Sequence, residues 1–306
     1  MRLAAETPLA PERAPAAESP WRRFASEFAE SRIALAALAI LAVIVVLAIA
    51  APWIAPQNPY DLSQLDVLDS KLAPGSQSMA GRTFWLGTDD QGRDMLSAIL
   101  FGLRISLTVG IASTIAALTI GLATGLAAAY FGGWVDAAIM RIADIQLSFP
   151  AILIALILLA MVGQGTGKIV VALITVQWAY YARTVRSSAM VERQKEYIEA
   201  ARALALSQPR IVLRHLLPNC LPPLIVVATV QVAHAITLEA TLSFLGLGLP
   251  ITEPSLGLLI ANGFQYLLSG TYWISFYPGL ALLATIMAIN LVADQLRDIL
   301  NPRLRR

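Results

Sequence analysis

The sequence predicts an all-α membrane protein with six transmembrane helices and both termini in the cytoplasm. Of its 306 residues, 57% are hydrophobic and only 14% are charged, which is typical of a multi-pass membrane protein rather than a soluble domain. Apolar runs long enough to cross a bilayer recur along the chain. Lys and Arg gather in alternate connections, because 17 of the 22 fall in segments that this topology places inside.

The composition also argues against several other classes of protein. The formal net charge of +2 is spread over the connections instead of one face, so it does not indicate nucleic-acid binding. Cys220 is the single cysteine, which excludes an internal disulfide and offers no thiolate metal site. No nucleophile and base are recognisably paired, so the sequence predicts a protein that is not an enzyme.

Residues 1–32 are predicted to be a cytoplasmic tail whose first twenty or so residues are disordered, since they are rich in Ala, Pro and Glu. A basic and aromatic collar, Trp21-Arg22-Arg23-Phe24, fits the cytoplasmic membrane surface. Residues 33–51 form the first predicted span. A cleaved signal peptide is the alternative, because Ala48-Ile49-Ala50 resembles a cleavage site. The run exceeds an h-region of ~7–15 residues and five spans follow, so a retained span is favoured.

Residues 52–103 are predicted to form an outer, periplasmic segment, because acidic residues outnumber basic ones there. Thr88-Asp89-Asp90-Gln91 reads as a capping box, which predicts a helix that begins near Asp89 and continues into the second span. Arg93 and Asp94 are candidates for contact with a docked protein. A solvated local ion pair between them is the favoured alternative.

The second span, residues 105–131, carries a row of small residues spaced four apart, namely Ser113, Ala117, Gly121, Gly125 and Ala129. Such a row allows another helix to approach closely, so we expect helix packing there, with a substrate path as the alternative. The chain is then expected to return through the cytoplasm over residues 132–150, where Arg141 and Asp144 are spaced to pair on one helix.

Residues 149–162 and 169–182 are predicted to be the third and fourth spans, joined by the outer turn 163–168. This turn, Gly-Gln-Gly-Thr-Gly-Lys, imitates a phosphate-binding loop. It has too few residues between Gly163 and Gly167-Lys168, and Ile169 stands where a Ser or Thr would bind magnesium. The sequence therefore predicts no nucleotide site on this chain.

The fifth span, residues 221–245, holds polar side chains that are candidates for a translocation path: Gln231, His234, Thr237 and Glu239. Ionisable groups at membrane depth are functional candidates by default. At about 100° per residue, Glu239 lies about 140° from His234, which disfavours a relay between them. The alternative is that His234 bonds a neighbouring helix and Glu239 reaches the outer water. Residues 273–292 form the sixth span, and 297–306 a basic cytoplasmic tail.

A polar interruption, residues 196–219, separates the fourth span from the fifth. Tyr197, Ala201 and Leu204 recur at i, i+4 and i+7, which predicts a short amphipathic helix with these residues on one face. Ser207 or Gln208 is suited to cap a second helix, and Pro209 suits its first turn. Two short helices that meet at a bend form a compact docking element on the aqueous face.

This interruption resembles the EAA loop of binding-protein-dependent ABC importer permeases, through Glu199-Ala200-Ala201 and the later Arg214-His215-Leu216-Leu217-Pro218-Asn219. The resemblance implies that the loop couples the chain to a cytoplasmic ATPase, through Tyr197, Glu199, Ala200, Ala201, Arg202, Leu204, Ala205, Leu206 and Pro209. The family usually has Gly at the bend, where this chain has Ala205. If the bend requires a positive φ, Ala costs about 1 kcal/mol there. The alternative is an ordinary positively charged cytoplasmic hairpin.

A further stretch, LGTDDQGRDMLSAILFGLRISL at 86–107, resembles the dipeptide, oligopeptide and nickel branch of that family. LEATLSFLGLG at 238–248 again resembles the peptide-importer branch, and MRIADIQLSFP at 140–150 resembles the family in general. The resemblance implies a type I importer fold with a permease core over residues 104–296, in a bacterial inner membrane. It implies a homologous second permease, one or two ABC ATPase subunits and a periplasmic or lipid-anchored solute-binding protein as partners. ATP and magnesium would bind those ATPases, with no cofactor on this chain.

The function that this resemblance implies is ATP-driven import of di- or oligopeptides or similar small solutes. An ion-coupled secondary transporter is the main alternative, and it requires several buried ionisable groups, of which the spans offer only His234 and Glu239. A membrane scaffold without transport would leave the EAA-like loop unexplained.

Overall fold

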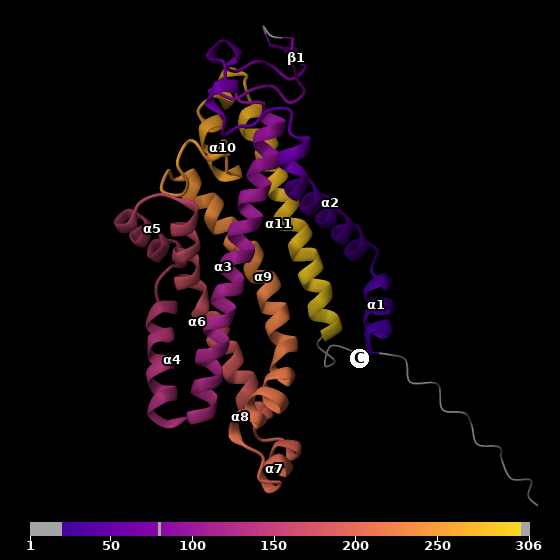
Figure 1. Ribbon diagram of the computed structural model, residues 1–306, viewed down its shortest axis with the longest axis vertical. Helices are drawn as coiled ribbons and strands as arrows, with labels where there is room; N and C mark the ends of the chain where they lie inside the picture. Colours follow the sequence, from indigo (N-terminus) through magenta and orange to yellow (C-terminus); the bar gives the residue numbers. More distant parts are fainter. Residues whose placement is uncertain (1–19, 79–80, 301–306) are drawn as a thin grey trace, which may run out of the picture.

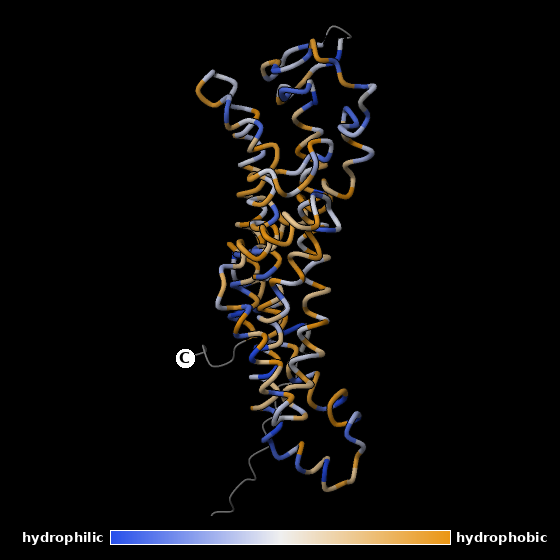
Figure 2. Tube along the Cα trace, turned by 90° about the vertical axis from the view of Figure 1, so that its left-hand side faces the viewer, coloured by the Kyte–Doolittle hydropathy of each residue, from blue (hydrophilic) through white to orange (hydrophobic). Residues whose placement is uncertain are grey.

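The computed structural model, which describes residues 20–78 and 81–300, is an elongated bundle of helices (Figure 1). The predicted disorder of the first twenty or so residues and most of the predicted C-terminal tail lie outside these ranges. Five long helices build the bundle: α2 (Arg32–Ile54), α3 (Met95–Phe131), α6 (Thr166–Glu192), α9 (Leu217–Phe244) and α11 (Trp273–Leu300). Hydrophobic residues dominate its middle, and hydrophilic ones gather toward its two ends (Figure 2).

Within the described ranges, four helices are long and apolar enough to cross a membrane: Arg32–Ile54, Met95–Phe131, Gln208–Phe244 and Trp273–Leu300. A fifth crossing is formed if α4 (Gly133–Leu147) and α5 (Ala151–Val162), which are bent by 89° at a short break, count as one span. Pro150 precedes α5 and cannot donate a backbone hydrogen bond, which explains a break at this point. Length and composition therefore support four to five spans. The predicted fourth span lies in α6, which packs along α3.

Residues 133–147, expected in a cytoplasmic return, form the straight helix α4 beside α6 (Figure 1). The predicted pairing of Arg141 with Asp144 is wrong. Asp144 pairs with Arg183, and Asp136 accepts a hydrogen bond from Nη2 of Arg186 at 2.6 Å. Because α4 lies along α6, its carboxylates meet arginines of the neighbouring helix instead of their own.

The outer segment is a compact loop region with two short turns, η1 (Leu62–Gln64) and η2 (Val67–Asp69), and a two-stranded antiparallel sheet of β1 (Ser76–Gln77) and β2 (Thr83–Phe84). The predicted helix start near Asp89 is wrong, since α3 begins at Met95 with Asp94 as its N-cap. The Asp89 carboxylate instead accepts from the backbone and the side chain of Arg93, and Gly92 has φ +79°. This left-handed turn ends the predicted helix before it forms.

Arg93 and Asp94 do not form the predicted solvated pair, and neither is exposed for docking. Arg93 is 1% exposed, bonds Asp89 at 2.7 Å and donates to the carbonyl of Ile251 at 3.1 Å. Asp94 caps α3 by accepting from Ser97. The pair Arg93–Asp89 thus connects the outer segment to the loop that precedes α10 (Leu256–Phe264).

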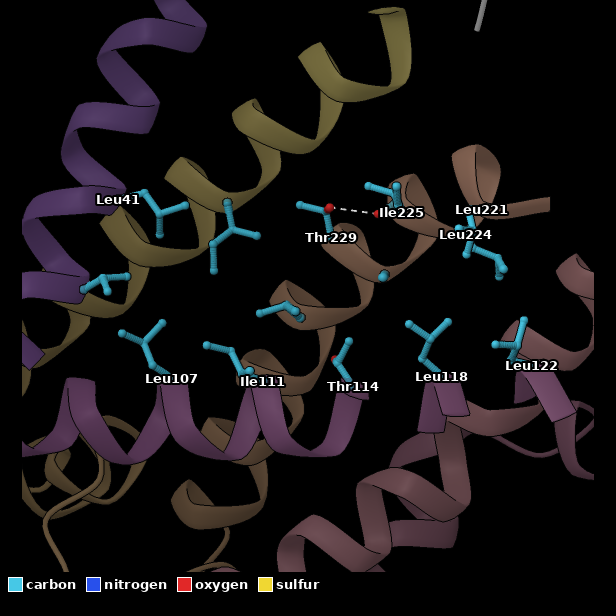
Figure 3. A pocket seen from close by; sticks show the side chains of 14 residues that line it. Leu41, Leu107, Ile111, Thr114, Leu118, Leu122, Leu221, Leu224, Ile225 and Thr229 are labelled. Atoms are coloured by element: carbon cyan, nitrogen blue, oxygen red, sulfur yellow. Dashed lines mark hydrogen bonds between the residues drawn. The ribbon is translucent and has the colours of Figure 1, made fainter. Parts of the chain in front are cut away.

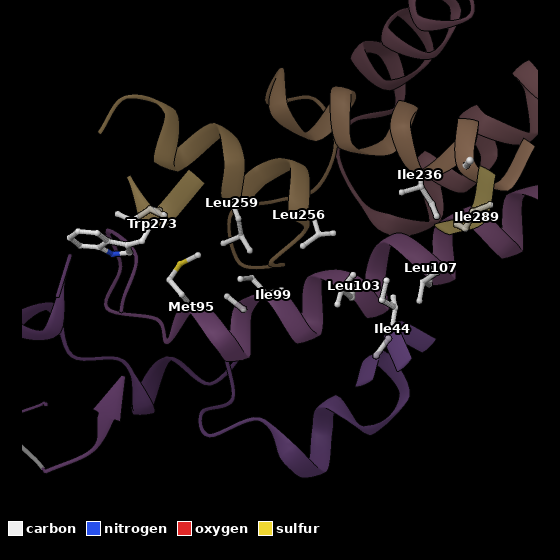
Figure 4. Close-up of a cluster of buried hydrophobic side chains, with 14 residues drawn as sticks. Ile44, Met95, Ile99, Leu103, Leu107, Ile236, Leu256, Leu259, Trp273 and Ile289 are labelled. Carbon is white, nitrogen blue, oxygen red and sulfur yellow. The ribbon is translucent and has the colours of Figure 1, made fainter. Parts of the chain in front are cut away.

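The hydrophobic core is continuous from the outer end into the middle of the bundle. In Figure 4, side chains of α2, α3, α9, α10 and α11 meet in one cluster, from Trp273 at its outer end to Leu107 and Ile289. The N-terminal helix α1 (Pro20–Glu30) packs its Phe28 against α2 and Val292 of α11. A short turn, η4 (Leu267–Ser269), precedes α11, which continues through Leu300 into the segment predicted as tail.

The small residues of α3 lie on the face that packs on α6. Ser113, Ala117 and Ala129 are nearly fully buried. A Cβ atom on Gly121 would lie 2.3 Å from Cβ of Tyr181, and one on Gly125 would lie 2.5 Å from the carbonyl oxygen of Ala182. Two helix backbones therefore approach one another more closely here than side chains would allow.

Candidate coupling site

The candidate coupling loop, residues 196–219, occupies the end of the molecule opposite β1 (Figure 1). It begins with α7 (Glu196–Ala203), turns, and continues through the short α8 (Gln208–Arg210) and a π-helical turn, η3 (Ile211–Leu216), into α9. Ser207 occupies the N-cap position of α8 and Pro209 lies in its first turn, as expected, but the Ser207 side chain forms no capping hydrogen bond. The two-helix arrangement predicted from the sequence is present.

Ala205 has φ +54°, so the bend requires the left-handed conformation that was considered for it. The amide of Ala205 bonds the carbonyl of Arg202 at 2.9 Å, and the amide of Leu206 bonds that of Ala201 at 3.2 Å. These two bonds form a Schellman motif, which normally has glycine at this position. Ala205 therefore adopts the glycine conformation at a cost of about 1 kcal/mol.

The coupling loop has a small core of its own, formed by Ile198, Ala201 and Ile211 with Leu206 packed against them. Of the predicted face, only Ala201 lies in this core, because Leu204 is 74% exposed and Tyr197 is 36% exposed. The Schellman turn directs Leu206 back onto Ala201, as such motifs commonly do. The buried face of α7 is consequently shifted to Ile198 and Ala201.

Tyr197 and Lys195 connect the start of α7 to the last residue of α6. The Tyr197 hydroxyl donates to Glu192 at 2.6 Å, and Nζ of Lys195 lies 2.6 Å from the same carboxylate. Partial burial and this carboxylate acceptor raise the pKa of Tyr197 to about 12, so the phenol keeps its proton at neutral pH. Sequence reasoning missed Glu192, because the chain bends between it and Tyr197 and no helical spacing relates them.

The outward side of the loop combines exposed aliphatic and charged side chains. Leu204 and Leu213 are 74% and 62% exposed. Exposed neighbours from the predicted set are Glu199, Ala200, Arg202, Ala205 and Pro209. An exposed leucine bordered by both signs of charge is suited to a protein partner, with the charges selecting orientation.

The π-helical turn places the loop at a defined angle to α9. The amide of Leu217 bonds the carbonyl of Val212, five residues back. Pro218 follows with no N–H to donate, and its ring would clash with the carbonyl of Arg214 in a regular helix. The side chain of Asn219 donates to the carbonyl of His215 at 2.7 Å. Pro218 is the sequence signal for this irregularity, which helical spacing alone does not predict.

The polar residues of α9 separate into two environments. The side chains of His234 and Thr237 lie on the exposed surface of this single chain, whereas Gln231 is 8% exposed and Glu239 is fully buried. The Glu239 carboxylate accepts hydrogen bonds from Ser106 and Ser243, both at 2.8 Å. The alternative in which Glu239 reaches the outer water is therefore wrong, because the neighbouring helices cover it.

A groove of about 390 Å³ opens between α2, α3, α9 and α11. Figure 3 shows aliphatic side chains lining it, with Thr114 and Thr229 as the hydroxyl-bearing members. The Thr229 hydroxyl is directed along its own helix and donates to the carbonyl of Ile225. The lining includes none of the four path candidates of α9. The predicted translocation-path residues therefore do not line this groove.

The glycine-rich turn at 163–168 contacts the loop that follows α9. The amide of Gly165 bonds the carbonyl of Gly248 at 3.2 Å, Gln164 donates to Gly246, and the Thr166 hydroxyl donates to Glu253 at 2.6 Å. One backbone amide and two polar side chains of the turn thus bond the other connecting segment. The turn acts here as a structural connection at the end of the bundle away from α7 (Figure 1).

Long apolar helices with a separate two-helix element at one end are the arrangement expected of a membrane transport permease. Residues 117–306 match the family model described as binding-protein-dependent transport system inner membrane component. Residues 19–74 match the N-terminal TM domain of oligopeptide transport permease C. The chain therefore belongs to the binding-protein-dependent inner membrane permeases, and it is a permease C-type, multi-pass component of such a system.

Curated relatives cover almost all of the chain. It is 38% identical to the dipeptide transport system permease protein DppC of Escherichia coli (strain K12), over 96% of both chains. It is 36% identical to the di/tripeptide transport system permease protein DppC of Pseudomonas aeruginosa (strain UCBPP-PA14), over 94% of this chain and 93% of the relative. The glutathione transport system permease protein GsiD of Pectobacterium atrosepticum is 34% identical over 94% and 92%.

A solved structure is similar in fold. A chain of the inward-facing MetNI methionine ABC transporter aligns with a TM-score of 0.55 at 23% identity, covering 67% of this chain and 97% of that chain. At this identity the comparison shows the arrangement of helices alone.

Proposed function

We propose that this chain is one transmembrane half of an ATP-driven importer of di- or oligopeptides or similar small solutes. The observation that carries the proposal is the coupling loop, with a packed core of its own and an outward face of Leu204, Glu199 and Arg202. The similar relatives are named as permeases of dipeptide, di/tripeptide and glutathione transport systems, and these names support a peptide-like solute.

In this proposal the chain crosses the membrane six times in a type I importer fold, with both termini in the cytoplasm. The four apolar helices, the bent pair α4–α5 and the long helix α6 supply six crossings. The similarity to a MetNI chain and the concentration of Lys and Arg in the proposed inner segments support this topology.

The partners in the proposal are a second, homologous permease, one or two cytoplasmic ABC ATPases and a periplasmic or lipid-anchored solute-binding protein. ATP and magnesium bind the ATPases, which press on the coupling loop when they close. Because α9 continues directly from the loop, displacement of the loop moves this helix and alternates access between the two sides.

Two measurements test the proposal. Proteoliposomes that contain both permeases and the ATPases, supplied with the binding protein, should take up a radiolabelled dipeptide only when ATP is present on the ATPase side. Uptake driven by a proton or sodium gradient without ATPases would instead establish a secondary transporter.

Cysteine crosslinking tests the docking surface. The native Cys220 is buried, so an introduced cysteine supplies the reactive thiol. Leu204→Cys should crosslink to an ATPase subunit in membranes, whereas Val67→Cys, which is 80% exposed in the outer segment, should not. A Leu204→Cys variant that assembles and transports but never crosslinks to an ATPase would contradict the proposed contact.

A further inference from the structure

The outer half of α9 contains a buried group of polar side chains that the coupling loop does not use. It consists of Ser106 of α3, Glu239 and Ser243 of α9, and Ser255, the N-cap of α10, and we refer to it as the serine–carboxyl cluster. All four residues are 0% exposed. Ser106 donates to Oε2 of Glu239 and Ser243 to Oε1, each at 2.8 Å, and the Ser255 side chain interacts with the same carboxyl.

The same junction is closed by glycines. A Cβ on Gly257 would lie 2.2 Å from the carbonyl oxygen of Ala240, the residue after Glu239. A Cβ on Gly102 would lie 3.0 Å from Leu256, and one on Gly248 would lie 2.2 Å from Oγ of Ser243. The backbones of α9 and α10 therefore leave no room for an added carbon beside Glu239, and α3 packs tightly on the start of α10.

A carboxyl is an expensive group to bury unless its hydrogen bonds are satisfied. Within residues 20–78 and 81–300, Glu239 forms no ion pair. It accepts hydrogen bonds from Ser106 of α3 and Ser243 of α9, and it interacts with Ser255 at the start of α10, whose Gly257 packs on the residue after Glu239. Hydrogen bonds are directional, whereas the aliphatic contacts around them permit sliding. The cluster consequently fixes the relative position of α3, α9 and α10.

The cluster lies on the helix that continues from the coupling loop. Glu239 is ~33 Å from Leu217 along α9, at ~1.5 Å per residue. One turn further in, Gly110 of α3 packs on Ile236 of α9, since a Cβ there would lie 2.7 Å from the Ile236 side chain. Displacement of the loop is thereby transmitted along α9 to a point where three elements are joined.

We infer that Glu239 is a positioning residue that joins the outer parts of α3 and α9 and the helix α10 into one unit that moves with the coupling loop. The inference rests on the proposed function for its direction of transmission, from the ATPase side to the outer side. It does not place Glu239 in contact with solute, because the carboxyl is fully covered. Its role is to convert movement of the inner end of α9 into movement of α10.

The test uses the complete complex in proteoliposomes, with uptake of radiolabelled alanyl-alanine and ATP hydrolysis measured on the same sample. Glu239→Ala should lower uptake per ATP hydrolysed by at least about fivefold while hydrolysis continues. Glu239→Gln, which retains a carbonyl acceptor, should restore most of the coupling. Ser106→Ala removes one bond and should have a smaller effect in the same direction.

Ser113→Ala is the matched control, since Ser113 is also a fully buried serine of α3, but its hydroxyl donates to the carbonyl of Val109 in its own helix at 2.7 Å. It should leave uptake per ATP unchanged. If Glu239→Ala does not assemble, Ser106→Ala, which removes only the bond between α3 and α9, tests the same role with a milder change. The inference would be overturned if Glu239→Gln lowered uptake per ATP as much as Glu239→Ala does. It would also be overturned if Ser113→Ala lowered uptake per ATP as much as Ser106→Ala does.

A second readout is independent of transport. Leu258 of α10 is buried, with 6% of its surface exposed. A cysteine in its place (Leu258→Cys) should therefore react slowly with an impermeant maleimide in the otherwise unchanged chain. It should react rapidly when Glu239→Ala is added. Equal slow labelling in both would overturn the positioning role. If the intact complex shows no ATP-dependent uptake, the proposed function fails, while this labelling still decides whether the cluster holds α10.

Discussion

Ala205 is held in a left-handed conformation by the hydrogen bonds on either side of it. The Schellman bonds from Ala205 and Leu206 stabilise the end of α7, and the contact of Leu206 with Ala201 belongs to the small core of the loop. The methyl group of alanine is tolerated at φ +54°, whereas a β-branched side chain is not. The strain thus lies at the point where the loop changes direction.

We expect Ala205→Gly to preserve transport and Ala205→Val to impair it. Glycine removes about 1 kcal/mol of left-handed strain in the folded state and increases the freedom of the unfolded chain by a similar amount. Valine adds a branched Cβ to the same conformation, so the turn must reshape and displace Leu204. Peptide uptake per ATP in the reconstituted complex measures the outcome, and full activity of Ala205→Val would show that the turn geometry does not govern coupling.

The side-chain carboxylate of Glu199 lies on the exposed face of α7. Within the described residues this carboxylate forms no ion pair and accepts no hydrogen bond. Glu199→Lys should therefore leave the fold intact and lower uptake per ATP by about tenfold, through a changed contact with the ATPase. Glu30→Lys makes the same charge change at the exposed end of α1 and serves as the control. Unchanged uptake by Glu199→Lys at normal expression would contradict the docking role.

Among the elements, α3 and α6 form an interface that depends on absent side chains. A Cβ on Gly121 would meet Tyr181 and the backbone of α6, whereas one on Gly279 of α11 has open space around it. Gly121→Ala should therefore destabilise the bundle by about 1–3 kcal/mol through overpacking. Gly279→Ala, also in a long apolar helix, should be neutral or slightly stabilising. Thermal unfolding of the detergent-solubilised protein compares them, and equal midpoints would reject the close packing of α3 on α6.

Hydropathy and spacing predicted most elements, because a span and a row of small residues are local patterns. The bend at Ala205 was predicted from the position of one residue that departs from a motif. The start of α3 was not, since Asp89 bonds Arg93 in a left-handed turn and Asp94 takes the capping position. The partners of Asp136 and Asp144 were missed for a related reason: they lie on α6, and a single sequence does not show which helices are neighbours.

At the scale of the whole molecule, the outer segment is fastened to the second half of the chain by groups far apart in sequence. Arg93 donates to the carbonyl of Ile251, and Nε1 of Trp273 donates to the carbonyl of Thr88 at 3.1 Å. These contacts join the segment before α3 to the loop before α10 and to the start of α11. The outer segment, α10 and the serine–carboxyl cluster are therefore consecutive parts of one outer assembly.

Arg93→Ala tests how strongly this assembly depends on its buried ion pair. Removal of Arg93 leaves the Asp89 carboxylate buried without its cation, which costs about 3–5 kcal/mol for such pairs. The expected result is a lower unfolding temperature and faster cleavage of the outer segment by an external protease. The double variant Arg93→Met with Asp89→Asn removes both charges and should recover part of the loss. If Arg93→Ala matches the unchanged protein in both assays, the outer segment is held by its apolar contacts and not by this pair.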